Sequence, residues 1–147
     1  MVVYKKVRRF KRKYPWTIAF RLKKHAKVVE NILDADENVL YAFCGQRNEG
    51  NTLIFDSCVV ALTNKRIIVG EKRLIGYFVL TVSPELFNDL KINSRLFFGQ
   101  IEIDTVKEKI FISDIDKKAL DEIETRVHDI MLDNKRRIKK EYEKYDK

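Results

Sequence analysis

Apolar residues in the last third of the chain recur at steps of three, four or seven, the spacing of one helix face. The members of this stripe are Leu120, Ile123, Val127, Ile130, Met131, Ile138 and Tyr142. Asp116 precedes the stripe as the predicted N-cap of a helix over about residues 116–145. Because the stripe is dense from 120 to 131 and thin after 134, we expect its first half to pack against the protein and its second half to be solvated.

The amino-terminal part divides into two segments. Residues 4–14, YKKVRRFKRKY, show no useful helical or strand period, and Pro15 closes the run. We therefore expect a basic arm over residues 1–16. From Thr17 a helical period begins, which predicts a helix within residues 17–35 that Thr17 could cap. Its apolar face consists of Ile18, Leu22, Ala26, Val29, Ile32 and Leu33.

The centre of the chain alternates short apolar runs with polar turns, which predicts β-strands. The expected strands cover residues 39–44, 53–62, 66–70, 77–82, 90–94, 96–104 and 109–112. A polar turn is expected at residues 46–51, and Gly99 suits a tight bend or a close backbone approach. Strands with one apolar face must bury it. A sheet that closes on itself beneath a capping helix does this and protects its edges.

Several of these segments resemble bacterial pleckstrin-homology-like (PH-like) domains of the YokE-like kind. The strongest motif is ALTNKRIIV, residues 61–69, which reads as a strand, a TNKR turn and a strand. A second is LFFGQI, residues 96–101, and the resemblance extends over about residues 36–132. It implies a mainly β (α+β) fold: a bent seven-stranded barrel or sandwich capped by the C-terminal α-helix, with an additional N-terminal helix. The expected organisation is a basic arm (1–16), an N-terminal helix (17–35) and a PH-like domain (36–147).

Charge is distributed unevenly along the chain. The 147 residues carry a net charge of +8 and suit one domain with its own core. Residues 1–29 contain eleven Lys or Arg and no acid, residues 30–134 sum to −7, and residues 135–147 sum to +4. The basic character therefore belongs to the two ends. The apolar runs are too short for a transmembrane helix, and the basic N-terminus lacks the apolar segment of a signal peptide. We expect a cytoplasmic protein, either free or peripheral at a membrane.

No arrangement of residues is typical of catalysis, so we expect no enzyme, no cofactor, no metal site and no small-molecule substrate. Cys44 and Cys58 lie in apolar segments, which favours buried, unreactive thiols. His25 and His128 fall in predicted helices without partners at the spacing of a metal site or a triad, which favours packing or surface roles. The five glycines are isolated and form no phosphate-binding loop.

The basic N-terminus is the strongest functional candidate, because its cations are interleaved with Tyr4, Phe10, Tyr14 and Trp16. On an anionic membrane the cations are attracted and the aromatic rings settle at the interface. On nucleic acid the cations replace counterions and the rings stack on bases. A specific protein site and a solvated tail are the other interpretations. The candidate binding residues are Lys5, Lys6, Arg8, Arg9, Lys11, Arg12, Lys13, Trp16, Arg21, Lys65 and Arg66.

The first hairpin departs from the pattern of PH-like domains that bind phosphoinositides, which carry several Lys and Arg there. The corresponding segment here, residues 46–51, contains only Arg47, beside Glu49. This departure argues against a phosphoinositide headgroup site in that hairpin. We therefore expect a non-enzymatic binding or scaffold module that mediates protein interaction or self-assembly as a homo-oligomer, or that lies on an anionic membrane surface. The alternative is a nucleic-acid-binding protein that uses the basic-aromatic N-terminus.

Overall fold

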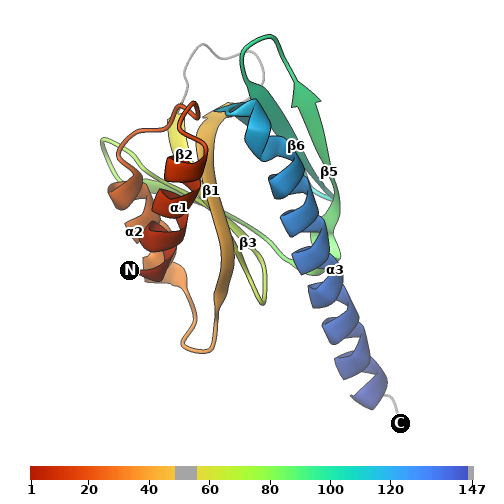
Figure 1. The fold of residues 1–147 in the computed structure, drawn as a ribbon. Coiled ribbons are helices and arrows are strands. Elements are labelled where there is room, and N and C mark those ends of the chain that lie inside the picture. Colours follow the sequence, from red (N-terminus) through yellow and green to blue (C-terminus); the bar gives the residue numbers. More distant parts are fainter. Residues whose placement is uncertain (49–55, 146–147) are drawn as a thin grey trace.

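A computed structural model describes residues 1–48 and 56–145 of the chain. Seven antiparallel strands form one strongly curled sheet, a half-barrel flanked by helices (Figure 1). The strands are β1 (Val39–Asn48), β2 (Asp56–Thr63), β3 (Ile67–Lys72), β4 (Tyr77–Val82), β5 (Phe87–Ser94), β6 (Gly99–Thr105) and β7 (Lys109–Ile115). The helices are α1 (Val2–Lys13), α2 (Leu22–Ile32), α3 (Leu120–Tyr145) and the 3-10 turns η1 (Pro84–Leu86) and η2 (Lys117–Ala119). The expected bent barrel with helices at both ends of the chain is confirmed.

The sheet bends where β1 meets β7. The strands follow the order β4-β3-β2-β1-β7-β6-β5, and β1 pairs with β2 along most of its length. β1 pairs with β7 only near its end, from Gln46–Ser113 onward. Helices α1 and α3 flank the earlier part of β1 (Figure 1). Arg126 of α3 donates a hydrogen bond of 2.8 Å to the Leu40 carbonyl. Helices and a side chain therefore protect this strand edge.

Helix α3 caps the half-barrel with the apolar stripe that the sequence predicts. Its residues Leu120, Ile123, Val127, Ile130 and Met131 are buried. Full burial of such a side chain contributes about 1.5–3 kcal/mol to folding. A Cβ at Gly99 would lie 2.6 Å from Leu120 Cδ2, so the expected close approach at this glycine is confirmed.

The second half of α3 leaves the barrel. Asn134 is the last buried residue of the helix, and its side-chain amide donates to the Thr63 carbonyl at 3.1 Å. Beyond it, residues 135–145 are exposed except for the half-buried Ile138. We call residues 135–145 the α3 extension, which projects past the sheet in Figure 1. The expectation of a docked first half and a solvated second half is confirmed.

Residues 2–13 form helix α1, so the prediction that this segment lacks helical periodicity was wrong. Val3, Val7 and Phe10 are buried on one side of the helix. Tyr14, the C-cap residue that follows the helix, is also buried. The spacing of four, three and four is helical, but two or three residues, mostly basic, separate each apolar position. Glu30 of α2 accepts hydrogen bonds from the backbone N–H groups of Val2 and Val3 at 3.2 and 3.0 Å. This carboxylate pairs two of the free backbone N–H groups at the start of α1, which has no capping side chain of its own.

Helices α1 and α2 cover the outer face of the strands β1 to β3 (Figure 1). A Cβ at Gly70 of β3 would lie 2.6 Å from Val29 Cγ2 of α2, so glycine permits this close packing. Helix α2 begins at Leu22, later than predicted, and Thr17 does not cap it. Thr17 instead accepts a hydrogen bond of 3.0 Å from the Asp116 backbone N–H, which draws residues 14–21 across the start of η2.

Several strand boundaries differ from the prediction. β1 continues to Asn48, so residues 46–48, expected in a turn, belong to a strand that pairs with both β2 and β7. The remainder of that turn and the expected start of the next strand at Leu53 lie outside the described residues. β7 continues to Ile115, beyond the predicted end at Ile112, because its later residues pair with β1 and β6.

Candidate functional site

Docking of α1 turns most of its cations to one side. The buried stripe of Val3, Val7 and Phe10 fixes the helix on the sheet, so the intervening basic side chains face away from it. Among the candidates on α1, Lys5, Arg8, Arg9, Arg12 and Lys13 are exposed, whereas Lys6 and Lys11 are half-buried. Lys11 donates to the Pro15 carbonyl at 2.9 Å. The N-terminal cations therefore belong to an ordered surface.

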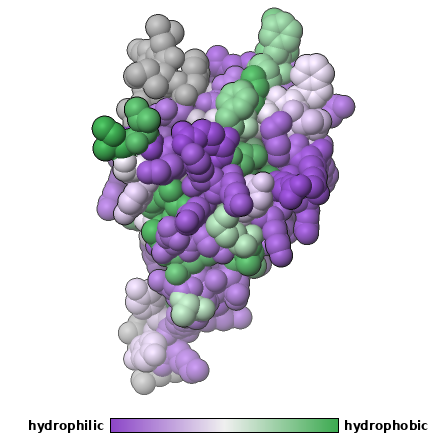
Figure 2. Space-filling model, turned by 90° about the vertical axis from the view of Figure 1, so that its left-hand side faces the viewer, coloured by the Kyte–Doolittle hydropathy of each residue, from purple (hydrophilic) through white to green (hydrophobic). Residues whose placement is uncertain are grey.

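Helix α2 extends this surface, because it packs beside α1. Arg21 immediately precedes it in the left-handed conformation with φ of 56°, and its side chain is exposed. We define the basic face as the exposed cations Lys5, Arg8, Arg9, Arg12, Lys23, Lys24 and Lys27. Figure 2 shows a broad hydrophilic expanse on this side of the molecule. No member of the basic face forms an ion pair with the acidic side chains of residues 1–48 and 56–145.

The linker between α1 and α2 presents aromatic side chains beside these cations. Trp16 is 73% exposed, and Phe20 is also exposed. The backbone N–H of Phe20 donates to Ser57 Oγ at 2.9 Å, and that of Trp16 approaches Asp116 Oδ2 at 3.4 Å. The backbone of the linker is thus tied to β2 and to the start of η2.

Two strand turns add exposed aliphatic and aromatic groups. Leu74 and Ile75 in the β3–β4 turn are 95% and 91% exposed, and Leu96 and Phe97 in the β5–β6 turn are also exposed. We call these four residues, with Trp16 and Phe20, the apolar turns. Figure 2 shows hydrophobic side chains at the upper end of this side, above the hydrophilic expanse. Of these six residues, only Trp16 was a candidate from the sequence. The apolar pair Leu74–Ile75, between two predicted strands, was an available signal, whereas Leu96 and Phe97 were expected in a strand.

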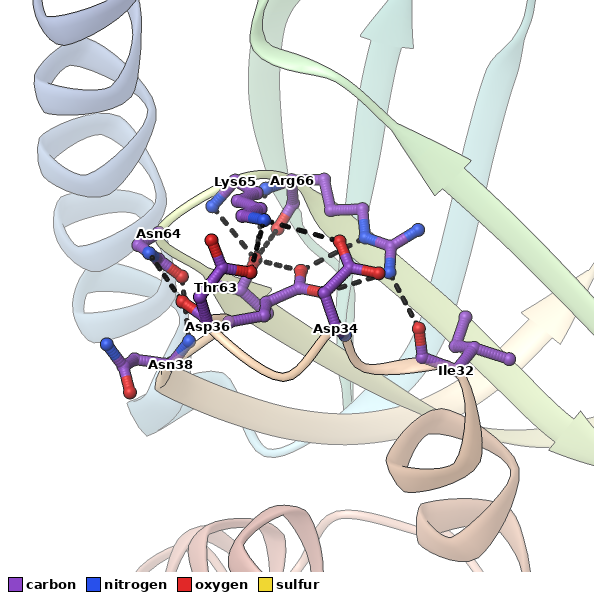
Figure 3. A network of polar contacts seen from close by, with 9 residues as sticks. Ile32, Asp34, Asp36, Asn38, Thr63, Asn64, Lys65 and Arg66 are labelled. Carbon is purple, nitrogen blue, oxygen red and sulfur yellow. Dashed lines mark hydrogen bonds and ion pairs between the residues drawn. The ribbon is translucent and has the colours of Figure 1, made fainter.

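Lys65 and Arg66 lie in a separate polar network between the β2–β3 turn and the α2–β1 loop (Figure 3). Arg66 donates to both oxygens of Glu37 at 2.9 and 3.0 Å and to the Ile32 carbonyl at 2.8 Å. Lys65 pairs with Asp36 at 2.7 Å and approaches Asp34 at 3.4 Å. The structure therefore engages these two candidates with acidic partners and does not place them on the basic face.

Thr63 and Asn64 extend this network, and we call Asp34, Asp36, Glu37, Asn38 and residues 63–66 together the clamp. Thr63 Oγ1 donates to Glu37 at 2.6 Å, and Asn64 Oδ1 accepts from the Asn38 backbone N–H at 2.7 Å. Burial opposes ionisation of Glu37, but its hydrogen bonds outweigh burial and hold its pKa at about 2. All four residues of the TNKR motif thus join two loops.

The comparisons with known proteins agree with this fold and this motif. The family profile of the bacterial PH domain matches residues 33–129, which include the clamp and all seven strands. The chain belongs to the bacterial PH domain family. No curated protein matches the chain. Among solved structures, it is similar to the C-terminal domain of an unknown protein from Leishmania infantum, with a TM-score of 0.58 and 16% identity over 72% of this chain and 93% of that one.

The first hairpin of this bacterial PH domain turns its cation inward. Arg47 is buried, and its Nε donates to Glu71 Oε1 at 2.5 Å. Its guanidinium lies 4.0 Å from the centre of the Phe78 ring. Burial raises the pKa of Glu71 above its usual range, against the opposing effect of Arg47. Arg47 is therefore engaged with side chains of β3 and β4.

The cysteines and histidines occupy structural positions in the bacterial PH domain. Cys44 and Cys58 are buried, which confirms that prediction, and burial raises the pKa of Cys44 to about 12. His25 is buried and accepts the Lys72 backbone N–H at Nδ1 over 2.7 Å. His128 is exposed. Within the described ranges, no group of three His, Cys, Asp or Glu side chains could hold a metal ion, and no helix is long and apolar enough to cross a bilayer.

Proposed function

We propose that this bacterial PH domain is a non-enzymatic module that docks peripherally on an anionic membrane surface. The basic face would be attracted to the lipid headgroups, and the apolar turns would insert among them. One observation carries the proposal: uncompensated cations on α1 and α2 lie beside Trp16 and Phe20, whose linker is tied to the barrel. Each Lys or Arg near such a surface contributes about 1 kcal/mol, and Trp and Phe favour the interface.

The exposed aliphatic groups favour a membrane over a nucleic acid. Both partners would attract the basic face, and aromatic rings could stack on unpaired bases. Leu74 and Ile75 have no stacking surface, yet they are almost fully exposed. Burial among lipid headgroups and acyl chains would remove these side chains from water, which is favourable.

The proposal also places the protein at the cytoplasmic side of a membrane and in the YokE-like group of bacterial PH domains. The cytoplasmic leaflet carries the anionic lipids that attract basic segments, so we place the protein on that side of a membrane. The TNKR and LFFGQI motifs support the narrower YokE-like affiliation. A protein partner, or a second copy in a homo-oligomer, would contact the surfaces left free, foremost the α3 extension.

Vesicle sedimentation tests the proposal. The full chain should bind vesicles of phosphatidylcholine with phosphatidylserine, should not bind vesicles of phosphatidylcholine alone, and should lose binding as salt screens the charges. The Lys23→Gln/Lys24→Gln/Lys27→Gln variant and the Leu74→Ser/Ile75→Ser variant should each bind more weakly. The matched control, Arg136→Gln/Lys139→Gln/Lys140→Gln, removes the same charge from the α3 extension and should bind almost as the parent chain does.

Three results would contradict membrane docking: equal binding to both kinds of vesicle, equal losses in the two triple variants, or no binding. Retarded mobility of a single-stranded oligonucleotide without vesicle binding would support the nucleic-acid alternative instead. Light scattering on the same samples would report self-assembly.

A further inference from the structure

A small cleft lies between α1 and α3, over the early part of β1, which these helices flank in Figure 1. Its volume is about 220 Å³, below the range of about 300–1,000 Å³ that is typical of sites for drug-sized ligands. The charged and hydroxyl groups that line it are Lys6, Arg9, Lys13, Tyr41, Glu122 and Arg126. From the sequence alone, the N-terminal cations were expected in an arm, with no association with α3.

The cations of the cleft converge from two helices. Lys6, Arg9 and Lys13 are spaced by three and four residues, so they share one side of α1. Arg126 faces them from α3. Its guanidinium donates to the Leu40 carbonyl at 2.8 Å and lies 5.3 Å from the centre of the Tyr41 ring. This support positions Arg126 before any ligand arrives, which reduces the entropic cost of binding.

One carboxylate occupies the cleft together with these four cations. Glu122 pairs with Lys13 at 2.5 Å and accepts the Tyr41 hydroxyl at 2.9 Å. Lys6 and Arg9 have no ion-pair partner among the described residues. The formal charge of the lining is therefore positive, and the Lys13–Glu122 ion pair joins the two helices across the cleft.

We propose that this cleft binds a phosphate group, in a phosphomonoester lipid headgroup or in a small soluble phosphate. Lys6, Arg9 and Arg126 would donate charge-assisted hydrogen bonds, and Lys13 would exchange Glu122 for a phosphate oxygen. The cleft is separate from the first hairpin, whose Arg47 is engaged with Glu71. The lipid form of the proposal rests on the proposed membrane function, whereas the soluble form does not.

Titration of the full chain with pyrophosphate tests the cleft directly. We expect saturable NMR shifts at the backbone amides of Tyr41 and Arg126. The Lys6→Gln/Arg9→Gln variant should weaken affinity by about tenfold or more, because it removes two charge-assisted hydrogen bonds. The control Lys5→Gln/Arg8→Gln removes the same charge from α1 outside the cleft and should weaken affinity by less than about threefold, since its effect is only screened attraction. Equal losses would overturn the proposal.

A substitution at Glu122 gives a prediction of opposite sign. Glu122→Gln removes the acid that competes for Lys13, so pyrophosphate should bind about threefold or more tightly. Thermal unfolding of each variant reports whether the fold persists. Weaker binding in a folded Glu122→Gln chain would overturn the proposal, because Glu122 would then favour ligand binding and would not compete with the ligand for Lys13.

Vesicles of equal charge separate the two sources of phosphate. Phosphatidic acid offers a phosphomonoester and phosphatidylglycerol offers a phosphodiester. The parent chain should prefer phosphatidic acid, and the Lys6→Gln/Arg9→Gln variant should lose that preference. Lys5 and Arg8 belong to the basic face, so the Lys5→Gln/Arg8→Gln variant should bind both kinds of vesicle more weakly but keep the preference for phosphatidic acid. Pyrophosphate binding without vesicle binding would reject the proposed membrane function and leave the cleft as a site for a soluble phosphate. Vesicle binding without pyrophosphate binding or lipid preference would retain the membrane function and reject the cleft.

Discussion

Among single residues, Glu37 connects two loops that are distant in the sequence. Its carboxylate accepts hydrogen bonds from Arg66 and Thr63, and these bonds hold its pKa at about 2 despite burial. A carboxyl group with a depressed pKa in the folded state stabilises the fold above its ordinary pKa of 4.5. That contribution is lost as pH falls from about 4.5 toward 2.

Glu37→Gln should therefore lower the free energy of unfolding by about 3 kcal/mol near neutral pH. It should also flatten the acid dependence of stability between about pH 5 and pH 2. Urea unfolding across this range measures both effects. Asp36→Asn is the matched control, because Asp36 is an exposed partner of Lys65 in the same loop and its substitution should change stability much less than Glu37→Gln does. A similar acid dependence in the parent and Glu37→Gln chains would contradict this role.

His25 provides a second pH-dependent contact between α2 and the sheet. Burial, with a smaller effect of Arg21, lowers its pKa below the ordinary 6.5. Its Nδ1 accepts the Lys72 N–H, so the neutral ring is the form that packs. The unfolded chain binds the proton more readily, and stability should fall as pH drops below about 6.5. Urea unfolding should show a smaller loss of stability on acidification in His25→Gln than in the parent chain, and an equal loss in the two chains would exclude this role for His25.

At the scale of elements, α1 is held by its apolar stripe. Phe10 is buried, and its ring centre lies 5.1 Å from that of Tyr14 and 6.1 Å from that of Phe43. Phe10→Ala should lower the free energy of unfolding by about 3–5 kcal/mol, as expected for a buried phenylalanine. Phe20→Ala, at an exposed ring of the linker, should change it by less than about 0.5 kcal/mol. Chemical denaturation measures both variants, and a negligible effect of Phe10→Ala would mean that α1 does not dock.

At the scale of the whole molecule, Trp16 can report which end faces a membrane. It is the only tryptophan of the chain, and its linker lies at the end opposite the C-terminus (Figure 1). Its fluorescence should shift to the blue on anionic vesicles and be quenched by brominated lipids. In the relocated variant Trp16→Phe/Tyr145→Trp, the reporter sits on the α3 extension and neither change is expected. Quenching at both positions would contradict a fixed orientation.

Elements stabilised by residues close together in the sequence were predicted well, and elements stabilised by distant residues were not. The strand Tyr77–Val82 and the docked half of α3 were predicted closely, because their patterns are local. The start of α2 was missed, because Thr17 forms its contact with Asp116, distant in the sequence. At the candidate site, the sequence identified the cations of α1 but not their partners.

Local patterns along the chain were enough to predict the number and order of the strands, the capping helix and the concentration of positive charge at the two ends. Periodicity, turn residues and counts of charge are properties of short segments, so they can be read without coordinates. Which cations are available to a partner depends on how the chain folds. Arg66 and Arg47 are paired with Glu37 and Glu71, whereas Lys6 and Arg9 face Arg126 across a cleft. The environment of a charge depends on residues far away in the sequence, which only the folded chain brings beside it.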